Sequence, residues 1–395
     1  MSKQLCSTLW EGFDKVIEAR TTLQNLFDRS DQDGLSSDAI ASAIKAFEDQ
    51  KAEYETLLNN SATLPDGTPI YATDYLALCK LAADNNIDPK IIFEHIDEYS
   101  LTSSGRVSQI DLSNLGIANI SALRHVTEVS TMFLGDNRII DISPIQSLTK
   151  LTVLLLHKNQ IADIRPVQNL KALVQLQLSN NLIVDISPVQ KLTALEQLHL
   201  TNNQIADISA LQELTALTRL DLSENQIADI KPIQKLTALN RLELNHNQLV
   251  DITPIQYLTN LDWLNLGSNQ IVNISPVRSL AALSVLYLQA NQIANIDPIQ
   301  YLNGLTFLHL GHNQIVDISP IQNLAALTDL GLANNKIVDI SPVQNLTALT
   351  FLDLRENRIV DISTIQNLNR KADFYFIDNP LSDASQAILA ARSKK

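Results

Sequence analysis

The sequence predicts an α/β solenoid of about 13 stacked, leucine-rich turns, preceded by an α-helical domain. Asparagine recurs every 22 residues without insertion or deletion. Leucine and isoleucine hold constant positions around each asparagine, whereas the first 105 residues lack this pattern. Fixed periods of about 20 to 50 residues are typical of stacked structural repeats. The recurring residues are Asn137, Asn159, Asn181, Asn203, Asn225, Asn247, Asn269, Asn291, Asn313, Asn335, Asn357 and Asn379.

One unit, residues 217–233, illustrates how each turn is built. Its inward residues are expected to be Leu217, Leu220, Leu222, Ile227, Ile230 and Ile233, because a single turn cannot bury one face alone and stacked turns can. Apolar and variable residues alternate around Leu220 and Leu222, which predicts a short strand with one exposed face. Stacking therefore forms one parallel sheet, and a degenerate first turn begins near Arg106.

Two polar features of the turn have predicted structural roles. The asparagine side chain is expected to form a ladder, bonding backbone groups that burial would otherwise leave unpaired. In the step from Asp339 to Pro342, Ser341 is expected to cap a short helical turn, with Pro342 at its first position. Proline holds that position in nine turns and is replaced by Ala210 and Thr364 in others. Proline is harmful in a central strand, so this segment belongs to the outer side.

The two ends depart from the repeat and are expected to close the solenoid. Phe374 and Phe376 replace strand leucines, and residues 383–390 are typical of a short terminal helix. The N-terminal region is expected to contain helices near 3–28, 37–58, 73–84 and 89–99, with Ser36 or Ser37 capping the second and Asp88-Pro89 starting the fourth. The predicted domains are an acidic helical domain or cap at 1–105, the solenoid at 106–379 and a helical cap at 380–395. The first is expected to cover the first turn, and its length leaves a second binding role open.

The charge distribution excludes several classes of partner. The net charge is −14; residues 1–105 hold 8 Lys+Arg and 18 Asp+Glu, a net of −10, and the remainder holds a net of −4. No basic stripe is present to neutralise phosphates, so neither nucleic acid nor an anionic membrane surface is expected as a partner. No run of 18 apolar residues occurs, and membrane insertion is not expected.

The cysteines and the first residues bear on localisation. Only Cys6 and Cys79 are present, and they are expected to be free thiols in a reducing compartment. No apolar run follows Lys3, and Glu11 and Asp14 come soon afterwards, so no Sec signal peptide is expected. The expected location is the cytoplasm, or the exterior by a route without a Sec signal peptide.

The sequence contains no recognised catalytic, metal-binding or phosphate-binding motif. Asp31-Gln32-Asp33-Gly34 is similar to a calcium loop, but Arg29 and Ile40 then occupy its first and twelfth ligand positions, so a solvated turn is expected. His309 and His312 share one turn and His199 neighbours Asp221, without the spacing of a metal site. No glycine-rich phosphate loop and no nucleophile elbow occur. We therefore expect no catalytic residue, no metal, no cofactor and no enzymatic activity; only unrecognised chemistry in residues 1–105 would support an enzyme.

The repeat resembles a known family. Asn-x-Ile-x-Asp-Ile-x-Pro-Ile followed by Leu-Thr-x-Leu is similar to the 22-residue repeats of bacterial internalins, over roughly three quarters of the chain. The resemblance implies an α/β leucine-rich-repeat solenoid with a curved parallel sheet, whose concave face binds a protein ligand. The period also resembles that of the regulatory-subunit family of protein phosphatase 1, which is not marked by the Asp-Ile-Ser-Pro step.

The variable strand positions are the candidates for partner binding. They lie six and four residues before each asparagine, and neighbouring strands are about 4.8 Å apart. An aromatic cluster with further candidates nearby is therefore expected: Trp263, Val285, Tyr287, Phe307, His309, Phe351, Arg219 and Arg241. Exposed aromatic residues near arginine are usual interface anchors. Arg219 and Arg241 lie beside Asp221 and Glu243 and could equally form a self-paired, solvated charge patch.

Phe133 and Leu155 are either a second contact or a surface covered by the N-terminal domain. The predicted function is an internalin-like protein-binding module that uses the concave face of the sheet. The alternative is an intracellular scaffold or regulatory subunit that binds partners through both the helical domain and the sheet.

Overall fold

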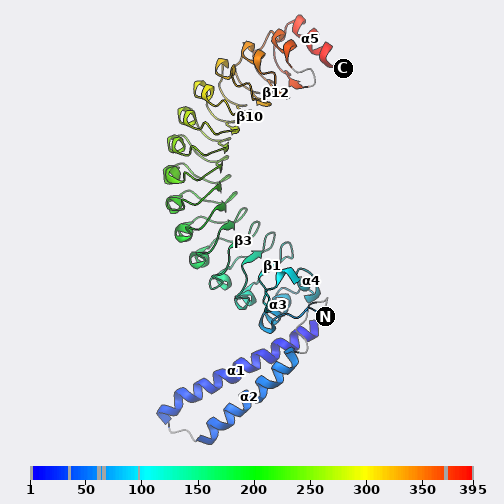
Figure 1. The fold of residues 1–395 in the computed structure, drawn as a ribbon, viewed down its shortest axis with the longest axis vertical. Helices are drawn as coiled ribbons and strands as arrows, with labels where there is room; N and C mark the ends of the chain where they lie inside the picture. Colours follow the sequence, from blue (N-terminus) through cyan, green and yellow to red (C-terminus); the bar gives the residue numbers. More distant parts are fainter. Residues whose placement is uncertain are drawn as a thin grey trace. The chain divides into compact units, whose positions relative to one another are not determined.

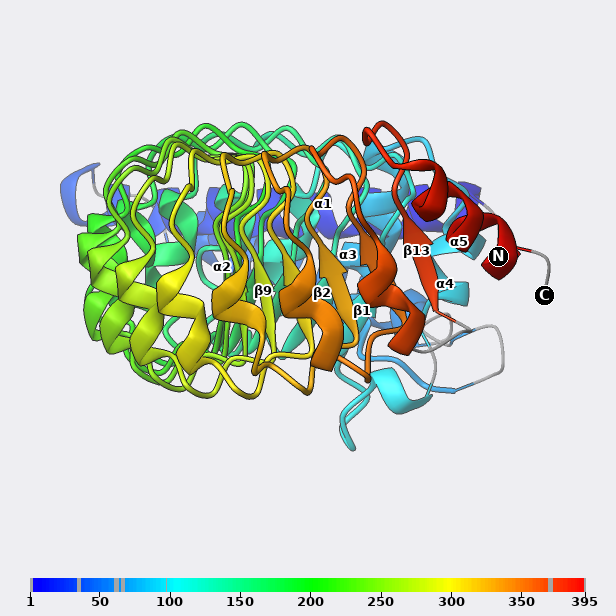
Figure 2. The same cartoon turned by 90° about the horizontal axis from the view of Figure 1, so that it is seen from above.

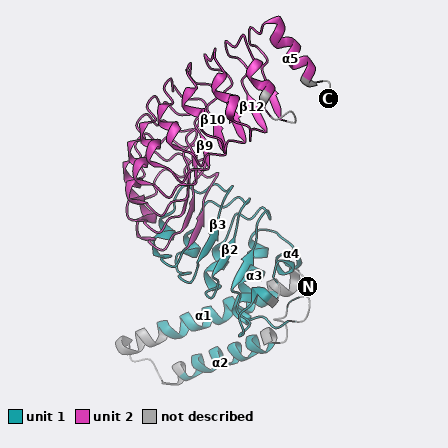
Figure 3. Cartoon of the chain, turned by 45° about the horizontal axis from the view of Figure 1, so that its top comes forward, with its two compact units in different colours: residues 1–173 teal, residues 174–395 magenta. Residues whose placement is uncertain are grey.

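The computed structural model describes residues 3–33, 37–59, 64, 68–96, 98–368 and 372–393. The chain divides into two compact units, residues 1–173 and residues 174–395 (Figure 3). The three domains expected from the sequence remain a prediction. Unit 1 contains the helical region and the first strands, and unit 2 contains the rest of the repeat.

The helices of unit 1 follow the sequence prediction closely until the fourth. They are α1 (Lys3–Asp33), α2 (Ser37–Asn59), α3 (Ala72–Asp84) and α4 (Pro89–Glu94), followed by a 3-10 turn at Glu98–Ser100. α1 lies along α2 and packs against α3 (Figure 1). The side chain of Asp88 accepts a hydrogen bond from Lys90 N at 3.0 Å and caps α4, as expected.

Two predictions for the helical region are wrong. α4 does not continue to residue 99, because His95 (φ −89°, ψ 7°) leaves the helical conformation. α1 continues through Asp33, so Asp31–Asp33 is helical and is not a turn. Gly34 and Ser36 lie outside the described residues, as does the side chain of Ser37.

A buried ion pair ties α3 to the first turn of the repeat. The carboxylate of Asp74, which is 0% exposed, accepts hydrogen bonds at Oδ2 from Arg106 Nε (2.9 Å) and Val107 N (2.8 Å). Burial raises the pKa of Asp74, and the hydrogen bond from Arg106 opposes that rise. The Arg106 guanidinium also lies 4.5 Å from the centre of the Tyr71 ring. Asp74 Oδ1 is buried and has no hydrogen-bond partner in the part of the chain that the structure describes.

The expectation of free thiols is wrong for Cys79. Cys79 lies on α3 with 0% exposure and is disulfide-bonded. The chain's other cysteine, Cys6, belongs to α1, and its side chain lies outside those described. A cysteine count carries no information on distance between residues far apart in the chain.

The strands pair in parallel with an offset of one repeat. In unit 1 these are β1 (Gln109–Asp111), β2 (Thr131–Phe133) and β3 (Val153–Leu155), with Ile110 opposite Met132. Unit 2 contains β4 (Gln175–Gln177), β5 (Gln197–His199), β6 (Arg219–Asp221), β7 (Arg241–Glu243), β8 (Trp263–Asn265), β9 (Val285–Tyr287), β10 (Phe307–His309), β11 (Asp329–Gly331), β12 (Phe351–Asp353) and β13 (Asp373–Tyr375). These thirteen strands confirm the α/β leucine-rich-repeat solenoid. Phe133 and Leu155 are half-buried on β2 and β3.

Each strand of unit 2 is joined to the next by an outer segment that contains a 3-10 turn. The strands line the inner side of the curve of unit 2, and the 3-10 turns lie on its outer side (Figure 1). These turns are Ser187–Lys191, Ser209–Leu211, Lys231–Lys235, Thr253–Tyr257, Ser275–Ser279, Asp297–Tyr301, Ser319–Ile321, Ser341–Asn345 and Ser363–Asn367.

The prediction that serine caps these turns is wrong. Ser341 is the first residue of its turn and Ile340 holds the N-cap position, so Pro342 is second and not first as predicted. Instead, Asp339 accepts hydrogen bonds from the backbone N of Ser341 at 2.8 Å and from its hydroxyl at 2.9 Å. Aspartate two residues earlier reaches the backbone N–H of the turn more directly than serine at its start.

The asparagine ladder is present as predicted. Asn225 Nδ2 donates to the carbonyl oxygens of Leu200 (3.0 Å), Leu222 (3.1 Å) and Ser223 (3.0 Å). Its Oδ1 accepts from the backbone N of Ile205 at 3.0 Å. One side chain thus bonds the backbone of its own turn and of the turn before it. The same geometry recurs in the following turns, so the ladder holds the stack in register.

A left-handed residue precedes each asparagine, which the sequence analysis did not predict. These residues have φ between 53° and 60°: Asp136, Lys158, Asn180, Asn202, Glu224, His246, Ser268, Ala290, His312, Asn334, Glu356 and Asp378. None is glycine, and for most side chains this conformation costs about 1–2 kcal/mol. The turn demands it because the chain reverses direction immediately before the ladder side chain enters the core.

Helix α5 (Asp383–Ser393) lies against the last turn of unit 2 (Figure 2). Its Ser385 is 0% exposed; the hydroxyl donates to Val360 O at 2.9 Å and accepts from Ile362 N at 3.1 Å. The helix thereby satisfies backbone groups that a further turn would otherwise bond. This matches the expected terminal helix, and α5 extends three residues beyond residue 390.

Candidate protein-binding surface

Three rows of variable side chains lie along the strands of unit 2. We define the first, second and third rows as the residues six, four and two positions before each ladder asparagine. The first two rows flank a central leucine or phenylalanine that points into the core, and the register places neighbouring members of a row on neighbouring strands. The residues that the sequence predicts for binding, from Arg219 to Phe351, therefore all lie on this one face.

Six rings form a continuous series that we call the aromatic ladder: Trp263, Tyr287, Phe307, His309, Phe351 and Tyr375. The successive ring centroids are separated by 5.6 Å, 4.7 Å, 4.2 Å, 6.3 Å and 5.6 Å. Five of the rings are half-buried, and Tyr375 is 39% exposed. Val285 lies between Trp263 and Phe307 in the first row and is also half-buried. Each ring supports the next, so the series presents a fixed apolar surface.

At the β8 end, a charged residue covers the first ring. The Arg241 guanidinium lies 4.2 Å from the centre of the Trp263 ring and donates to Glu243 Oε1 at 2.8 Å. The indole Nε1 of Trp263 is buried and has no acceptor within the described ranges. Arg219 is exposed on β6, and its side chain makes no ion pair with any described residue. The two arginines thus differ, since only Arg241 is held in place.

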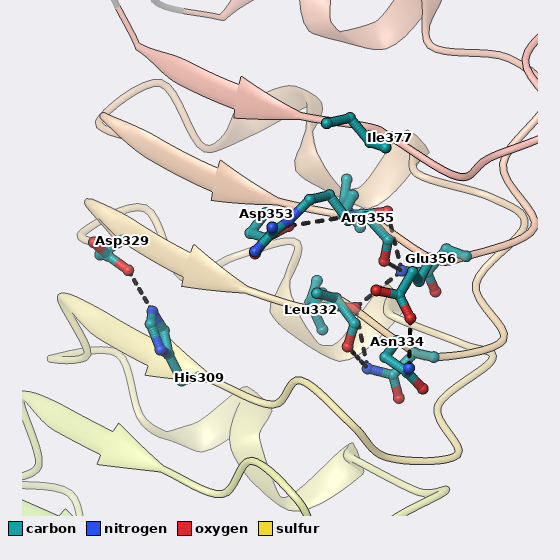
Figure 4. A network of polar contacts seen from close by, with 12 residues as sticks. His309, Asp329, Leu332, Asn334, Asp353, Arg355, Glu356 and Ile377 are labelled. Carbon is teal, nitrogen blue, oxygen red and sulfur yellow. Dashed lines mark hydrogen bonds and ion pairs between the residues drawn. The ribbon is translucent and has the colours of Figure 1, made fainter.

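His309 is a member of the aromatic ladder whose ring is held by the carboxylate of Asp329 (Figure 4). Its Nε2 lies 2.6 Å from Asp329 Oδ1, and its ring stacks on Phe307. The adjacent second-row residue is Gly331, where an added Cβ would lie 2.8 Å from His309 Cδ2. Glycine at this position leaves the space that the imidazole occupies.

Two strands from His309, β12 carries a paired carboxylate (Figure 4). Asp353 Oδ1 and Oδ2 accept from Arg355 Nε and Nη2 at 2.9 Å and 2.6 Å. Burial acts to raise the pKa of Asp353, but the hydrogen bonds from Arg355 outweigh it, and the pKa is lowered. The carboxylate therefore stays ionised at neutral pH. Burial also raises the pKa of Tyr287, whose hydroxyl remains a protonated donor.

The described residues contain no cluster of three or more His, Cys, Asp or Glu side chains that could hold a metal ion. Among those same residues, no helix is both long and apolar enough to cross a membrane. The chemistry of the face is thus that of aromatic, amide and carboxylate groups on a fixed scaffold.

Sequence reasoning left three contributors to this face out of its candidate set. Tyr375 extends the aromatic ladder, and its place in the second row was a sufficient signal. Asp329 orients His309 and belongs to the first row. Arg355 lies in the third row, 5.8 Å from the Tyr375 ring centre, and this row varies between turns as the other two do.

Comparison with known families supports the repeat assignment. The model for leucine-rich repeats, described as two copies, matches residues 171–213, 215–257, 259–301, 303–345 and 326–370. No curated protein sequence matches the chain. The family match therefore covers much of unit 2 and the very end of unit 1.

Solved structures give closer relatives. An internalin, InlF from Listeria monocytogenes, is 35% identical, with a TM-score of 0.70, 73% of this chain covered and 85% of that chain covered. A leucine-rich-repeat protein of Leptospira interrogans is 23% identical (TM-score 0.61, coverage 76% and 97%). The plant peptide hormone receptor RGFR1, solved with RGF2, is 21% identical (TM-score 0.58, coverage 67% and 49%). The last two show the fold alone. With identity and coverage of this extent to an internalin, the chain belongs to the internalin family of leucine-rich-repeat proteins.

Proposed function

We propose that the inner face of unit 2 binds a protein ligand through the aromatic ladder and that the chain is a binding module without enzymatic activity. The observation that carries this proposal is the unbroken contact of six rings on one face of a repeat scaffold. Large aromatic surfaces of this kind usually serve a contact.

The geometry supports tight and selective binding. Rings that already pack against one another lose little rotamer freedom when a partner covers them. The charges beside the aromatic ladder are held by neighbours, as Arg241 is by Glu243 and Asp353 is by Arg355. Such fixed charges favour one partner over another more than they add affinity. The net charge of −14 repels phosphate groups, which favours a protein partner over a nucleic acid.

Localisation outside a reducing compartment is part of the proposal. Disulfides persist in oxidising environments and are rare in the cytosol. The disulfide at Cys79 therefore favours the exported alternative over a cytoplasmic one.

The test is a pull-down from candidate lysates with wild type beside a Trp263→Ala, Tyr287→Ala, Phe307→Ala variant. We expect a partner that wild type retains and the variant loses, because each truncated anchor typically costs more than about 1 kcal/mol of binding free energy. The matched control is Gln175→Ala with Gln197→Ala, on β4 and β5 of the same face, which should retain the partner. Retention by the triple variant, shown to fold normally, would refute this use of the face.

A groove in unit 1 favours a second candidate function, in which the helical region binds another partner and the chain acts as a scaffold. The groove has a volume of about 1140 Å³ and is lined by Phe13 and Arg20 of α1, Phe47 and Tyr54 of α2, and Leu101. The Tyr54 hydroxyl is buried without a hydrogen-bond partner in the described part of unit 1. A groove of mixed apolar and polar lining with an unused donor is typical of a binding site.

A Phe47→Asp variant should abolish any capture that depends on this groove, because it places a charge among apolar side chains. Pull-downs that compare this variant with Lys45→Asp, on the exposed side of α2, measure the effect. A partner lost by Phe47→Asp and kept by the aromatic triple variant would establish two binding sites. The scaffold function is excluded if no partner shows that behaviour.

A further inference from the structure

The first row of the aromatic ladder has a spacing of its own. Trp263 lies on β8, Phe307 on β10 and Phe351 on β12, so a ring recurs on every second strand. The intervening strands carry Val285 and Asp329 at the same position. Since neighbouring strands are about 4.8 Å apart, the strands that carry the three rings are spaced at about 9.6 Å.

This interval is close to the period of one extended peptide conformation. A polyproline II helix has three residues per turn and rises about 3.1 Å per residue, so it repeats every 9.3 Å or so. A β-strand repeats its side chains at about 6.6 Å and an α-helix at about 5.4 Å, and neither matches. A segment in polyproline II conformation that runs across the strands would therefore present an equivalent residue to each ring.

The chemistry of the face suits proline. Proline-rich segments dock on aromatic-lined surfaces, and their preformed conformation lowers the entropy cost of binding. The conformation leaves every backbone carbonyl without an internal partner. Protonated Tyr287 and the amide of Asn265, both half-buried on this face, are placed to donate to such carbonyls.

The charges indicate how such a segment is oriented. At the β8 end, the cation of Arg241 over Trp263 is paired with Glu243. The other end carries the carboxylates of Asp329, Asp353 and Asp373 beside the cation of Arg355, and Asp373 is exposed on β13. A basic residue of the partner is therefore favoured near β11 to β13. From Trp263 to Asp373 is five strand steps, about 24 Å, which about eight residues of polyproline II span.

We propose that the aromatic ladder recognises a proline-rich segment in polyproline II conformation, with a basic residue at the end that lies beside Asp329 and Asp373. This inference rests on the proposed function, since it names the chemistry of the ligand for the same face. It requires only side chains on β8 to β13, all in unit 2.

The experiment is isothermal titration of the full chain with two synthetic peptides, both acetylated at the N-terminus and amidated at the C-terminus. The probe is a run of about six prolines, which spans the four strand steps (about 19 Å) from Trp263 to Phe351, followed by a pair of arginines. The control peptide replaces the prolines by alternating glycine and serine and keeps the arginines. Wild type is expected to bind the proline probe at least tenfold more tightly than the control.

Equal affinity for the two peptides, or no binding of the proline probe, would overturn the proposal. The pull-down with the triple variant could then still succeed, which keeps the two ideas separable.

A ring-exchange variant tests the spacing itself. Val285→Phe combined with Phe307→Val keeps the composition of the face and moves one ring by one strand. The proline probe should bind this variant at least tenfold more weakly, because the rings no longer match the period of the peptide. Unchanged affinity would contradict the proposal, since a general apolar surface would tolerate the exchange. Phe351→Leu, which removes a ring without adding polarity, should also weaken binding and provides a second reading if the exchange variant does not fold.

Discussion

Replacement of Asn247 by alanine should destabilise unit 2 by roughly 2–4 kcal/mol, because several buried backbone groups lose their hydrogen-bond partner at once. Asn247 is 8% exposed and donates to Leu222 O at 2.9 Å and to Leu244 O at 3.1 Å, while its Oδ1 accepts from Ile227 N at 2.9 Å. Alanine supplies neither donor nor acceptor. Water cannot replace them without opening the turn.

The free energy of unfolding in urea measures this effect, and hydrogen exchange localises it. Faster exchange is expected at the amides of Ile227 and its neighbours, since each turn depends on the turns beside it. Gln248→Ala is the matched control, because Gln248 is exposed and adjacent in sequence. The assignment of the ladder as the main polar support of the stack fails if both variants shift the unfolding midpoint equally.

Arg106→Ala should cost about 3–5 kcal/mol at neutral pH, the usual penalty for removing one partner of a buried ion pair. The variant leaves the carboxylate of Asp74 buried with Val107 N as its remaining hydrogen-bond donor among the described residues. Thr127 also loses the hydrogen bond that its hydroxyl accepts from Arg106 Nη2 at 2.9 Å. Unit 1 should therefore unfold at a lower urea concentration than in wild type.

The defect should also depend on pH. Burial already raises the pKa of Asp74, and the loss of Arg106 removes the hydrogen bond that opposes this rise, so the folded-state pKa in the variant is higher still. A group whose folded pKa is raised contributes stability below its unfolded pKa and loses it as pH rises through the folded pKa. The difference between variant and wild type should thus shrink in acid.

Urea unfolding at several pH values provides the measurement for this second prediction. Arg165→Ala is the control, because Arg165 is 79% exposed and pairs with Asp163 on the surface of unit 1. Surface pairs contribute about 0–1 kcal/mol, so that variant should stay near wild type. A defect in Arg106→Ala that grows in acid would contradict the buried-carboxylate explanation.

Much of this fold was predictable because each turn has the same packing and hydrogen-bonding environment. The leucines around Leu220 and the asparagine at position 225 meet the same neighbours in every turn, so one unit explains many. The left-handed residues were not predicted because residue types as different as Ala290 and Glu356 occupy the same position of the turn. The capping aspartate was misassigned to serine because both residue types accept hydrogen bonds, and only the geometry separates them.

The non-repeating parts were less predictable, since nothing recurs there to average over. The end of α4 at Glu94 depends on the local conformation of His95, and the pairing of Asp74 with Arg106 joins residues far apart in the chain. On the binding face, row positions could be listed from the sequence. The stacking of His309 on Phe307 depends on the empty position at Gly331, which is visible only when neighbouring strands are placed side by side.

The constant length of the turn also bears on how such a surface changes through time. Recombination between two similar turns adds or removes a whole turn, and the ladder asparagines then remain in phase. Every inner-face residue beyond the crossover is then displaced by one strand position along the sheet. A single genetic event of that kind would increase or decrease the number of strands between the rings of β8, β10 and β12 without disturbing the core. Ligand preference therefore diverges faster than stability.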